Sequence, residues 1–301
     1  MMKAVNFYLE IRRGAGFELK MAEFLLRSFA RFASQRGETH VCTRTVIQWS
    51  NQASSIAQRD ERLKTVRRFA LHVQAEDERH EVPPRDVFGY RKRRQLPFIY
   101  TPTDIHLLIQ AASRLGPRGT LRPHTYATLF ALLVATGLRV SEALALRLED
   151  VTSDGLIIRK TKFQKSRLVP LHETARAGLE RYLVLRKCEA ASSDQIFISR
   201  GRPLGRLTVY STFRKLLRPI HLEGGPRRKH PRIHDLRNTF AVRALEAGPH
   251  QRDDVSRHML ALSTYMGHRN ISATYWYLEA TPHLMQDISG ACETFWKGDR
   301  P

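Results

Sequence analysis

Four short stretches of the sequence carry cationic, imidazole and phenol side chains of the kinds that can break a phosphodiester bond. Their candidate residues, in chain order, are Arg139 in TGLR, Lys162 in TKFQK, His234 and Arg237 in HDLR, and His268 and Tyr277 in GHRNISATYWY. Attack on a phosphodiester needs a nucleophile, cationic donors to the non-bridging oxygens, and an acid for the leaving alkoxide. The four stretches contain a candidate for each of these parts.

Each candidate suits its part by its chemistry. Arg139 and Arg237 can each present a planar fork of donors to a phosphate. A tyrosine has a reference pKa of about 10, so Tyr277 attacks well only where its proton is taken and nearby cations favour the phenolate. The two histidines can donate to the phosphate oxygens or carry a proton. The lysine can protonate the 5′ oxygen as it leaves.

In this order, with a predicted β-hairpin between the first two, the stretches resemble the tyrosine recombinases, also called the phage integrase family. The resemblance covers residues from about 100 to about 290, and the helical region before them looks like a core-binding domain. It implies that two domains clamp a DNA duplex and that four protomers act on paired sites, with accessory or companion recombinase proteins as further partners. It also implies a 3′-phosphotyrosyl link, a free 5′ hydroxyl, and no metal or nucleotide cofactor. The catalytic set that it implies is Arg139, Lys162, His234, Arg237, His268 and Tyr277.

The cluster Tyr275-Trp276-Tyr277 leaves a choice of nucleophile. Tyr275 and Tyr277 are two residues apart, so on a helix they point in nearly opposite directions and only one can face a site. In the family pattern the nucleophile lies nine residues after the histidine of the Gly-His pair, which selects Tyr277. We therefore expect Tyr275 and Trp276 to be packing residues.

Two of these assignments have competitors. Lys165 competes with Lys162 for the place in the hairpin, and family members usually have glycines around this lysine where the chain has Thr161 and Phe163. Arg139 could instead form a structural ion pair with the nearby carboxylate at position 142.

Two further expectations concern the segment from HDLR to the Gly-His pair. Asp235 is expected to hold the start of a helix or orient a neighbour rather than take part in chemistry. The segment between Arg237 and His268 is longer than in the compact form of the motif. We expect its extra residues, centred on PHQRDDVSRH at 249–258, to form a loop between helices.

The whole chain is strongly basic. Its 301 residues include 50 Lys+Arg against 29 Asp+Glu, a formal net charge of +21. This excess favours a polyanionic partner, because neutralised phosphates release condensed counterions. The alternative is a solvated basic surface. The clusters expected to contact double-stranded DNA are Arg67 and Arg68; Arg91, Lys92, Arg93 and Arg94; and Arg227, Arg228 and Lys229.

Composition also predicts the compartment. Cys42, Cys188 and Cys292 are far apart, which argues against a disulfide framework or a cysteine zinc site and fits a reducing cytoplasm. The N-terminus lacks the apolar core of a signal peptide. The longest apolar run, residues 129–135, is far too short to span a membrane. We expect a cytoplasmic protein, associated with the bacterial nucleoid and without a membrane partner.

Periodicity and composition divide the chain into three parts. We expect a helical N-terminal core-binding, DNA-binding domain over 1–80, a basic linker over 81–98 and a catalytic domain over 99–301. The predicted elements are a helix with apolar residues at 21, 25, 29 and 32, helices at 43–54, 56–75, 173–187, 207–218, 235–247 and 256–267, a helix capped by Thr101, and a hairpin of LIIRK with RLVPL. The fold class is mainly α with a small β-sheet: a helical core-binding domain plus a mixed α/β catalytic domain.

The sequence therefore predicts a site-specific DNA recombinase or integrase that serves the integration, excision or transposition of a mobile element. The alternatives are a type IB topoisomerase and a DNA-binding regulator without catalysis. A last apolar stripe recurs at helical spacing at Leu284, Ile288, Ala291 and Phe295. We expect this C-terminal helix to dock on a neighbouring protomer; the alternative is that it covers the core of its own domain.

Overall fold

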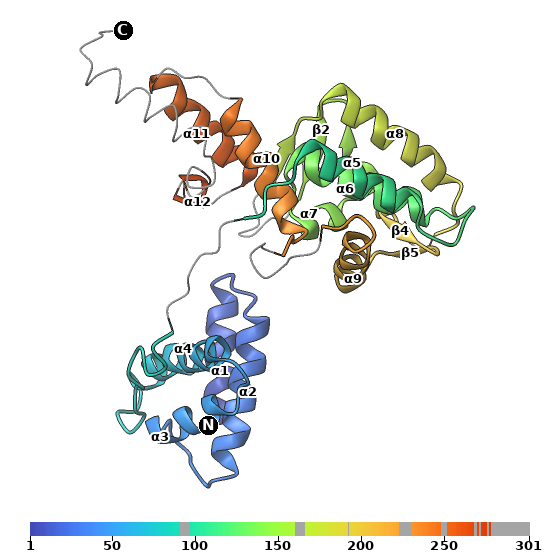
Figure 1. The fold of residues 1–301 in the computed structure, drawn as a ribbon. Coiled ribbons are helices and arrows are strands. Elements are labelled where there is room, and N and C mark those ends of the chain that lie inside the picture. The colour runs from blue at the N-terminus through green and yellow to red at the C-terminus, as the bar shows by residue number, and fades with distance from the viewer. Residues whose placement is uncertain are drawn as a thin grey trace, which may run out of the picture. The chain divides into compact units, whose positions relative to one another are not determined.

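The structure is a computed structural model that describes residues 1–90, 97–159, 166–191, 193–222, 230–247, 252–267, 270, 272–275 and 277. The chain divides into two compact units, Met1–Arg94 and Gln95–Pro301 (Figure 1). Each unit has its own hydrophobic core.

Four helices build the first unit. They are α1 (Met2–Gly14), α2 (Lys20–Ser34), α3 (Thr43–Asn51) and α4 (Ile56–Val73). Their common core buries Phe29, Trp49 and Phe69, and the Phe29 and Trp49 rings meet edge to face at 5.5 Å. The apolar stripe expected on α2 is wrong at Met21, which is exposed. Met21 lies in the first turn of the helix, and the buried side chains of α2 begin one turn later, at Leu25.

The second unit is mainly helical and carries two small antiparallel sheets. Its helices are α5 (Pro102–Ser113), α6 (Arg122–Thr136), α7 (Val140–Ala145), the 3₁₀ turn η1 (Leu148–Asp150), α8 (Glu173–Lys187), α9 (Arg206–Leu217), α10 (His234–Glu246), α11 (Arg252–Met266) and α12 (Ser272–Tyr275). Its strands are β1 (Val151–Thr152), β2 (Gly155–Ile158), β3 (Arg167–Val169), β4 (Ile198–Ser199) and β5 (Arg202–Pro203). Among the described residues of both units, none of the helices combines the length and apolarity that a membrane crossing requires.

The expected start of α5 is confirmed. The Thr101 hydroxyl accepts a hydrogen bond from the Asp104 backbone N–H at 3.1 Å, and the Asp104 carboxylate accepts one from the Thr101 N–H at 2.9 Å. This reciprocal pair satisfies two backbone donors at the helix end.

One expected loop is partly helical. The segment 249–258 was expected to be a loop, but α11 begins at Arg252. Ser256 and Arg257 are exposed on this helix. The polar composition of the segment therefore marks a solvated helix face, which the sequence pattern alone does not distinguish from a loop.

The expected hairpin is present. β2 and β3 pair antiparallel, with Leu156 opposite Val169 and Ile158 opposite Arg167, and β1 pairs with the other edge of β2. Side chains alternate between the faces of a strand, so Arg167 and Val169 share one face. Val169 is fully buried whereas Leu168 is exposed. The arginine therefore faces the interior of the unit.

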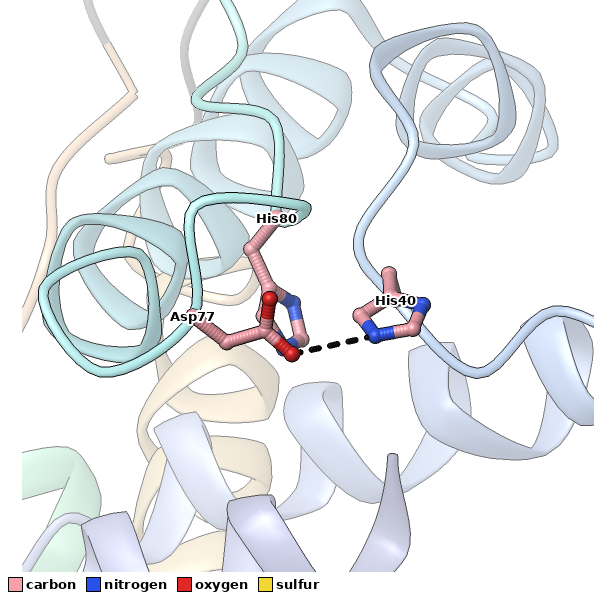
Figure 2. A group of neighbouring side chains, drawn as sticks. All are labelled: His40, Asp77 and His80. Atoms are coloured by element: carbon pink, nitrogen blue, oxygen red, sulfur yellow. Dashed lines mark hydrogen bonds and ion pairs between the residues drawn. The ribbon is translucent and has the colours of Figure 1, made fainter.

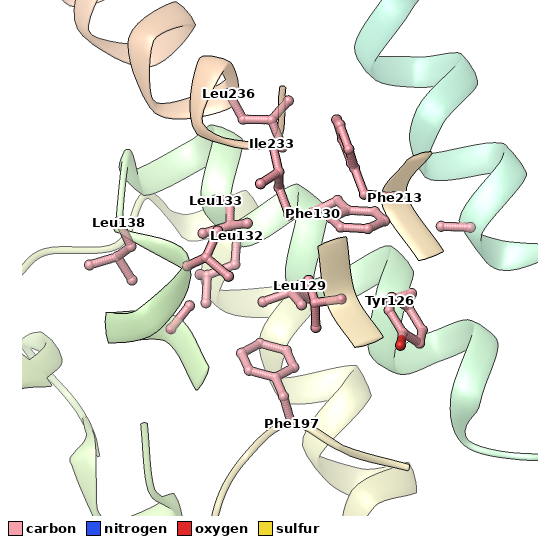
Figure 3. Packing of buried hydrophobic residues seen from close by; sticks show 14 of the residues in the cluster. Tyr126, Leu129, Phe130, Leu132, Leu133, Leu138, Phe197, Phe213, Ile233 and Leu236 are labelled. Carbon is pink, nitrogen blue, oxygen red and sulfur yellow. The ribbon is translucent and has the colours of Figure 1, made fainter. Parts of the chain in front are cut away.

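Helix α6 supplies much of the core that supports the site (Figure 3). Tyr126, Leu129, Phe130 and Leu133 are buried along it, and the ring of Phe213 from α9 lies 5.7 Å from that of Phe130. Burial of one such side chain contributes about 1.5–3 kcal/mol. This core fixes the position of α6 and of the turn that follows it.

Candidate active site

The turn between α6 and α7 delivers Arg139. α6 ends at Gly137, whose φ of 60° lies in the left-handed region that favours glycine. A Cβ at this position would lie 2.5 Å from Cδ1 of Phe240 and 3.1 Å from Sδ of Met266. The turn is thus packed closely against α10 and α11, and Arg139 follows it as the N-cap of α7.

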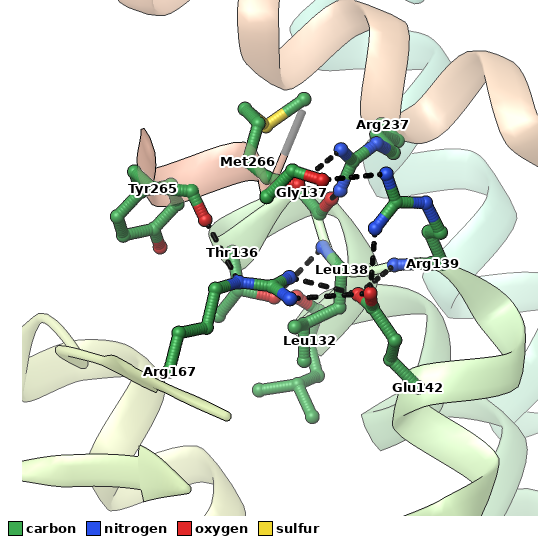
Figure 4. A network of polar contacts seen from close by, with 11 residues as sticks. Leu132, Thr136, Gly137, Leu138, Arg139, Glu142, Arg167, Arg237, Tyr265 and Met266 are labelled. Atoms are coloured by element: carbon green, nitrogen blue, oxygen red, sulfur yellow. Dashed lines mark hydrogen bonds and ion pairs between the residues drawn. The ribbon is translucent and has the colours of Figure 1, made fainter. Parts of the chain in front are cut away.

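Arg139 and Arg167 share one buried carboxylate, that of Glu142 (Figure 4). Arg139 donates from its backbone N–H to Oε2 at 3.0 Å and from Nη1 to Oε1 at 2.6 Å. Arg167 donates from Nη1 to Oε1 at 3.2 Å and from Nη2 to Oε2 at 2.8 Å. Burial opposes ionisation of Glu142, but the hydrogen bonds from Arg167 and then Arg139 lower its pKa to about 2. The ion pair considered as an alternative role for Arg139 is therefore present.

Three consecutive carbonyl groups at the end of α11 accept hydrogen bonds from three different arginines. The bonds are Arg167 Nε to Tyr265 O at 2.9 Å, Arg237 Nη2 to Met266 O at 2.6 Å and Arg139 Nη2 to Gly267 O at 3.1 Å. The last carbonyls of a helix lack partners within it and carry the negative end of its dipole, so cations are favourable there. The arginines come from β3, α10 and the N-terminus of α7, and these three elements therefore converge on the end of α11.

Arg237 is the most deeply buried of the three arginines. It is 2% exposed, and its Nη1 donates to the Gly137 carbonyl. Burial, followed by the charge of Arg139, lowers the pKa of Arg237 to about 10, whereas Tyr277 and Glu142 act in the opposite direction. Arg237 remains cationic at neutral pH. The Tyr277 phenol is also close enough to act electrostatically on it.

Tyr277 and Tyr275 lie in different environments. Tyr277 is 4% exposed and belongs to the apolar cluster of α10 and α11, with Val242 and Met266 among its members. Tyr275 is 49% exposed, so the expectation that it is a packing residue is wrong. It ends the short helix α12, and a side chain there reaches solvent instead of the cluster. Trp276 lies outside the described residues.

The HDLR motif begins α10. Partial desolvation, followed by the charge of Arg237, lowers the pKa of His234, so its imidazole is neutral at pH 7. Asp235 is fully buried. Its carboxylate accepts from the Arg232 backbone N–H and from Nδ2 of Asn238, both at 2.9 Å. Asp235 holds the start of the helix, as expected.

The other expected catalytic residues and two of the basic clusters lie outside the described part of the chain. They are Lys162 and its competitor Lys165, His268, Arg91, Lys92, Arg93, Arg94, Arg227, Arg228 and Lys229. The C-terminal stripe from Leu284 to Phe295 also lies outside it.

The third basic cluster is described, on α4 of the first unit. Arg67 and Arg68 line a cavity of about 260 Å³ together with Lys64, Arg85 and Asp86. Four cationic side chains and one carboxylate line this cavity. Two of the cations are paired, Lys64 with Asp60 at 2.7 Å and Arg68 with Glu61 at 3.5 Å.

One group of side chains in the first unit has the residue types of a metal site (Figure 2). His40, Asp77 and His80 each offer a ligand atom within 4.8 Å of the others. However, Nη2 of Arg79 lies 2.8 Å from the Asp77 carboxylate, and His80 Nδ1 accepts the Val41 backbone N–H at 3.0 Å. A neutral His80 that accepts at Nδ1 carries its proton on Nε2, so neither nitrogen is set up for a metal. The group instead joins the loop after α2 to the loop after α4.

Arg167 is the residue of this site that the sequence analysis missed. The signal was the alternation in RLVPL: with a buried valine at 169, the arginine at 167 faces the same side of the strand. A buried arginine needs a carboxylate partner. Glu142, three residues after Arg139, is the partner that the fold provides.

Residues 100–283 match the sequence model of the phage integrase family. The chain is 39% identical over 307 residues to the predicted integrase/recombinase y4rB of Sinorhizobium fredii, covering 98% of each chain. It is 34% identical over 234 residues to the tyrosine recombinase XerD of Caulobacter vibrioides, covering 75% of this chain and 72% of the relative.

Solved structures show a similar fold. The integrase of transposon Tn1549, in complex with transposon right end DNA, superimposes with a TM-score of 0.66 at 17% identity and covers 91% of this chain and 93% of that one. A λ integrase dimer bound to a core site superimposes with a TM-score of 0.62 at 18% identity, covering 92% and 94%. The mainly helical fold class with small sheets is thus confirmed. The chain belongs to the phage integrase family, the tyrosine recombinases, and is a site-specific DNA recombinase.

Proposed function

We propose that this recombinase breaks a DNA strand when the Tyr277 phenolate oxygen attacks the scissile phosphorus. The attack forms a bond between the tyrosine oxygen and phosphorus, and it breaks the bond to the 5′ oxygen, which takes a proton and leaves as a hydroxyl. The 3′-phosphotyrosyl link conserves the ester bond. The 5′ hydroxyl of a second strand can therefore reverse the reaction and complete an exchange without hydrolysis.

The observation that carries this proposal is the convergence of Tyr277 and the arginines at the end of α11. Arg139, Arg167 and Arg237 contribute three positive charges and Glu142 one negative charge, so these four side chains sum to +2. Cations fixed before the substrate arrives stabilise charge on the phosphate oxygens in the transition state. The same field favours the phenolate form of the tyrosine.

Arg139 suits direct contact with the phosphate despite its bond to Glu142. Its side chain is 32% exposed, whereas that of Arg167 is 14% exposed. We assign Arg139 and Arg237 as the donors to the non-bridging oxygens. The buried Arg237 supplies a charge that water screens little, and Arg139 supplies the more accessible fork.

Proton transfer falls to the histidines and the lysine. His234 is neutral at pH 7, so it can accept the phenol proton or donate a hydrogen bond to the phosphate. Lys162 and His268, outside the described residues, receive the roles that the family resemblance implies: Lys162 as the acid for the 5′ oxygen and His268 as a second imidazole at the phosphate. No step of this scheme uses a metal ion.

The substrate we propose is double-stranded DNA, held through phosphate contacts from the basic clusters, including Arg67 and Arg68. The relatives named above are integrases and recombinases, which favours integration, excision or transposition of a mobile element over topoisomerase or regulatory activity. We further propose that four protomers assemble on paired sites at the nucleoid, linked in part by the stripe from Leu284 to Phe295.

Covalent trapping tests the proposal. Duplexes taken from the DNA on either side of the gene, nicked so that a short 5′-hydroxyl fragment diffuses away, should include one that gives a protein–DNA adduct that survives denaturation. Tyr277→Phe should give no adduct while its DNA affinity stays within about twofold of wild type, because only a hydroxyl is lost. Tyr275→Phe removes the same group from the exposed neighbour and should react normally. An inactive 275 variant together with an active 277 variant would overturn the assignment.

A further inference from the structure

Arg167 occupies an unusual place for an arginine. It lies in a β-strand, on the face that buries Val169, and its side chain is only 14% exposed. Burial of a guanidinium group is costly unless its donors are satisfied. The contacts of Arg167 therefore have to compensate for its burial.

Each of the three guanidinium nitrogens of Arg167 donates a hydrogen bond to a protein group. Nη1 and Nη2 form a two-pronged pair with the Glu142 carboxylate, and Nε donates to the Tyr265 carbonyl (Figure 4). The guanidinium also lies directly against the backbone of Gly267, where an added Cβ would approach Nη1 to 2.9 Å. Its described hydrogen bonds therefore go to Glu142 and to the end of α11, which are the groups that also hold Arg139.

These contacts close a ring of interactions around Arg139. Glu142 joins Arg167 to Arg139, Arg139 reaches the Gly267 carbonyl, and Arg167 reaches the Tyr265 carbonyl of the same α11 end. The two arginines thus fasten the same carboxylate and the same last turn of the helix. A shift of either one moves a group that the other holds.

We propose that Arg167 is a positioning residue for DNA cleavage, which sets the orientation of Arg139 through Glu142 and holds the end of α11 in place for the nucleophile. The inference rests on the function proposed above. Without Arg167, two of the four hydrogen bonds that the described residues make to the Glu142 carboxylate are lost, and the carboxylate draws the Arg139 guanidinium further toward itself. A misplacement of about 1 Å in such a site can cost about 100-fold in rate.

The test compares three variants of the full chain. Arg167→Ala should lower the rate of adduct formation by about 10- to 100-fold, with DNA affinity unchanged. Arg167→Lys keeps the charge but cannot make the two-pronged pair, so it should recover part of the rate. The matched control is Arg176→Ala: Arg176 also serves this sheet, donating to the Thr152 and Ser153 carbonyls at 3.0 and 2.6 Å, and touches neither Glu142 nor α11 in the described contacts. It should cleave within about threefold of wild type.

Two further measurements separate positioning from general support of the fold. In an Arg139→Ala background, Arg167→Ala should slow cleavage much less than it does in the wild type, because the route through Arg139 is already lost and only the contact with the Tyr265 carbonyl of α11 remains. A substrate with sulfur as the 5′ leaving atom should not restore Arg167→Ala, because leaving-group protonation is not the step that suffers.

Several results would overturn the inference. They are wild-type cleavage by Arg167→Ala, equal losses in Arg167→Ala and Arg176→Ala, independent effects of Arg139→Ala and Arg167→Ala, or rescue by the sulfur substrate. If Arg167→Ala does not fold, Arg167→Lys carries the same comparison. A wild-type chain that forms no adduct would instead remove the proposed function, and this inference with it.

Discussion

Arg139 and Arg237 bind adjacent carbonyl groups, those of Gly267 and Met266, although they come from separate helices. Because the two carbonyls belong to one dipeptide, the end of α11 sets the spacing between the two guanidinium groups. Contacts within the protein fix this spacing, which is the condition for a preorganised electrostatic site. Met266, at this helix end, and the buried Tyr277 belong to the same apolar cluster.

The first prediction concerns the bridging role of Arg237. Arg237→Lys should lower the rate of adduct formation by about 100-fold or more while DNA affinity stays near that of wild type. A lysine carries one nitrogen, so it cannot hold the Gly137 and Met266 carbonyls together and still reach a phosphate. The matched control is Arg243→Lys on the same helix, where the arginine donates from Nη2 to the Tyr100 carbonyl at 2.8 Å. Similar losses in both variants would show that α10 is merely sensitive to substitution.

The second prediction concerns the turn at Gly137. Gly137→Ala should lower the melting temperature and slow cleavage, because the added Cβ meets Phe240 and displaces the turn that leads to Arg139. Gly119→Ala is the control, since Gly119 has a φ of 71° and no atom within 4 Å of the added Cβ. A left-handed alanine alone costs about 1–3 kcal/mol. The loss of stability in Gly137→Ala beyond that in Gly119→Ala measures the clash with Phe240. Equal losses in the two variants would mean that backbone strain accounts for the whole effect.

Features that depend on neighbouring residues in the chain were predictable from the sequence. Features that depend on contacts between distant segments were not. The Thr101 capping box and the β2–β3 hairpin follow from local spacing, and both are confirmed. The burial of Arg237 depends on the Gly137 and Met266 carbonyls, which come from distant segments of the chain, and no local sequence pattern reveals them. Tyr275 was placed wrongly because helical spacing separates two faces without saying which of them is covered.

The third prediction concerns Glu142 and acid. Its pKa in the folded protein is about 2, below the ordinary value of 4.5, so its contribution to stability is fully present above pH 4.5 and is lost as the pH falls from 4.5 toward 2. The lowering of the pKa from 4.5 to about 2 corresponds to about 3 kcal/mol in the free energy of unfolding. Glu142→Gln should therefore be less stable at pH 7 by a similar amount, since two arginines then face each other. Its free energy of unfolding should also depend less on pH below 4.5.

Urea unfolding of both proteins at a series of pH values measures this directly. The wild-type and variant stabilities should approach each other as the pH falls toward 2, because the wild-type carboxylate then becomes protonated. Parallel curves across this range would mean that the carboxylate is not the group that carries the effect.

The fourth prediction decides between the two hairpin lysines through the chemistry of the leaving group. Lys162→Ala should slow cleavage of ordinary DNA by about 10²- to 10⁴-fold, as expected when a general acid is removed. A substrate with sulfur at the 5′ leaving position should restore it, because a thiol has a pKa of about 8.5 and departs as the thiolate without a proton. Lys165→Ala is the matched control and should cleave both substrates at nearly the wild-type rate. Arg237→Lys should stay slow on both, because it lacks a donor to the phosphate and not the acid. Restoration of the 165 variant alone would transfer the acid role to Lys165.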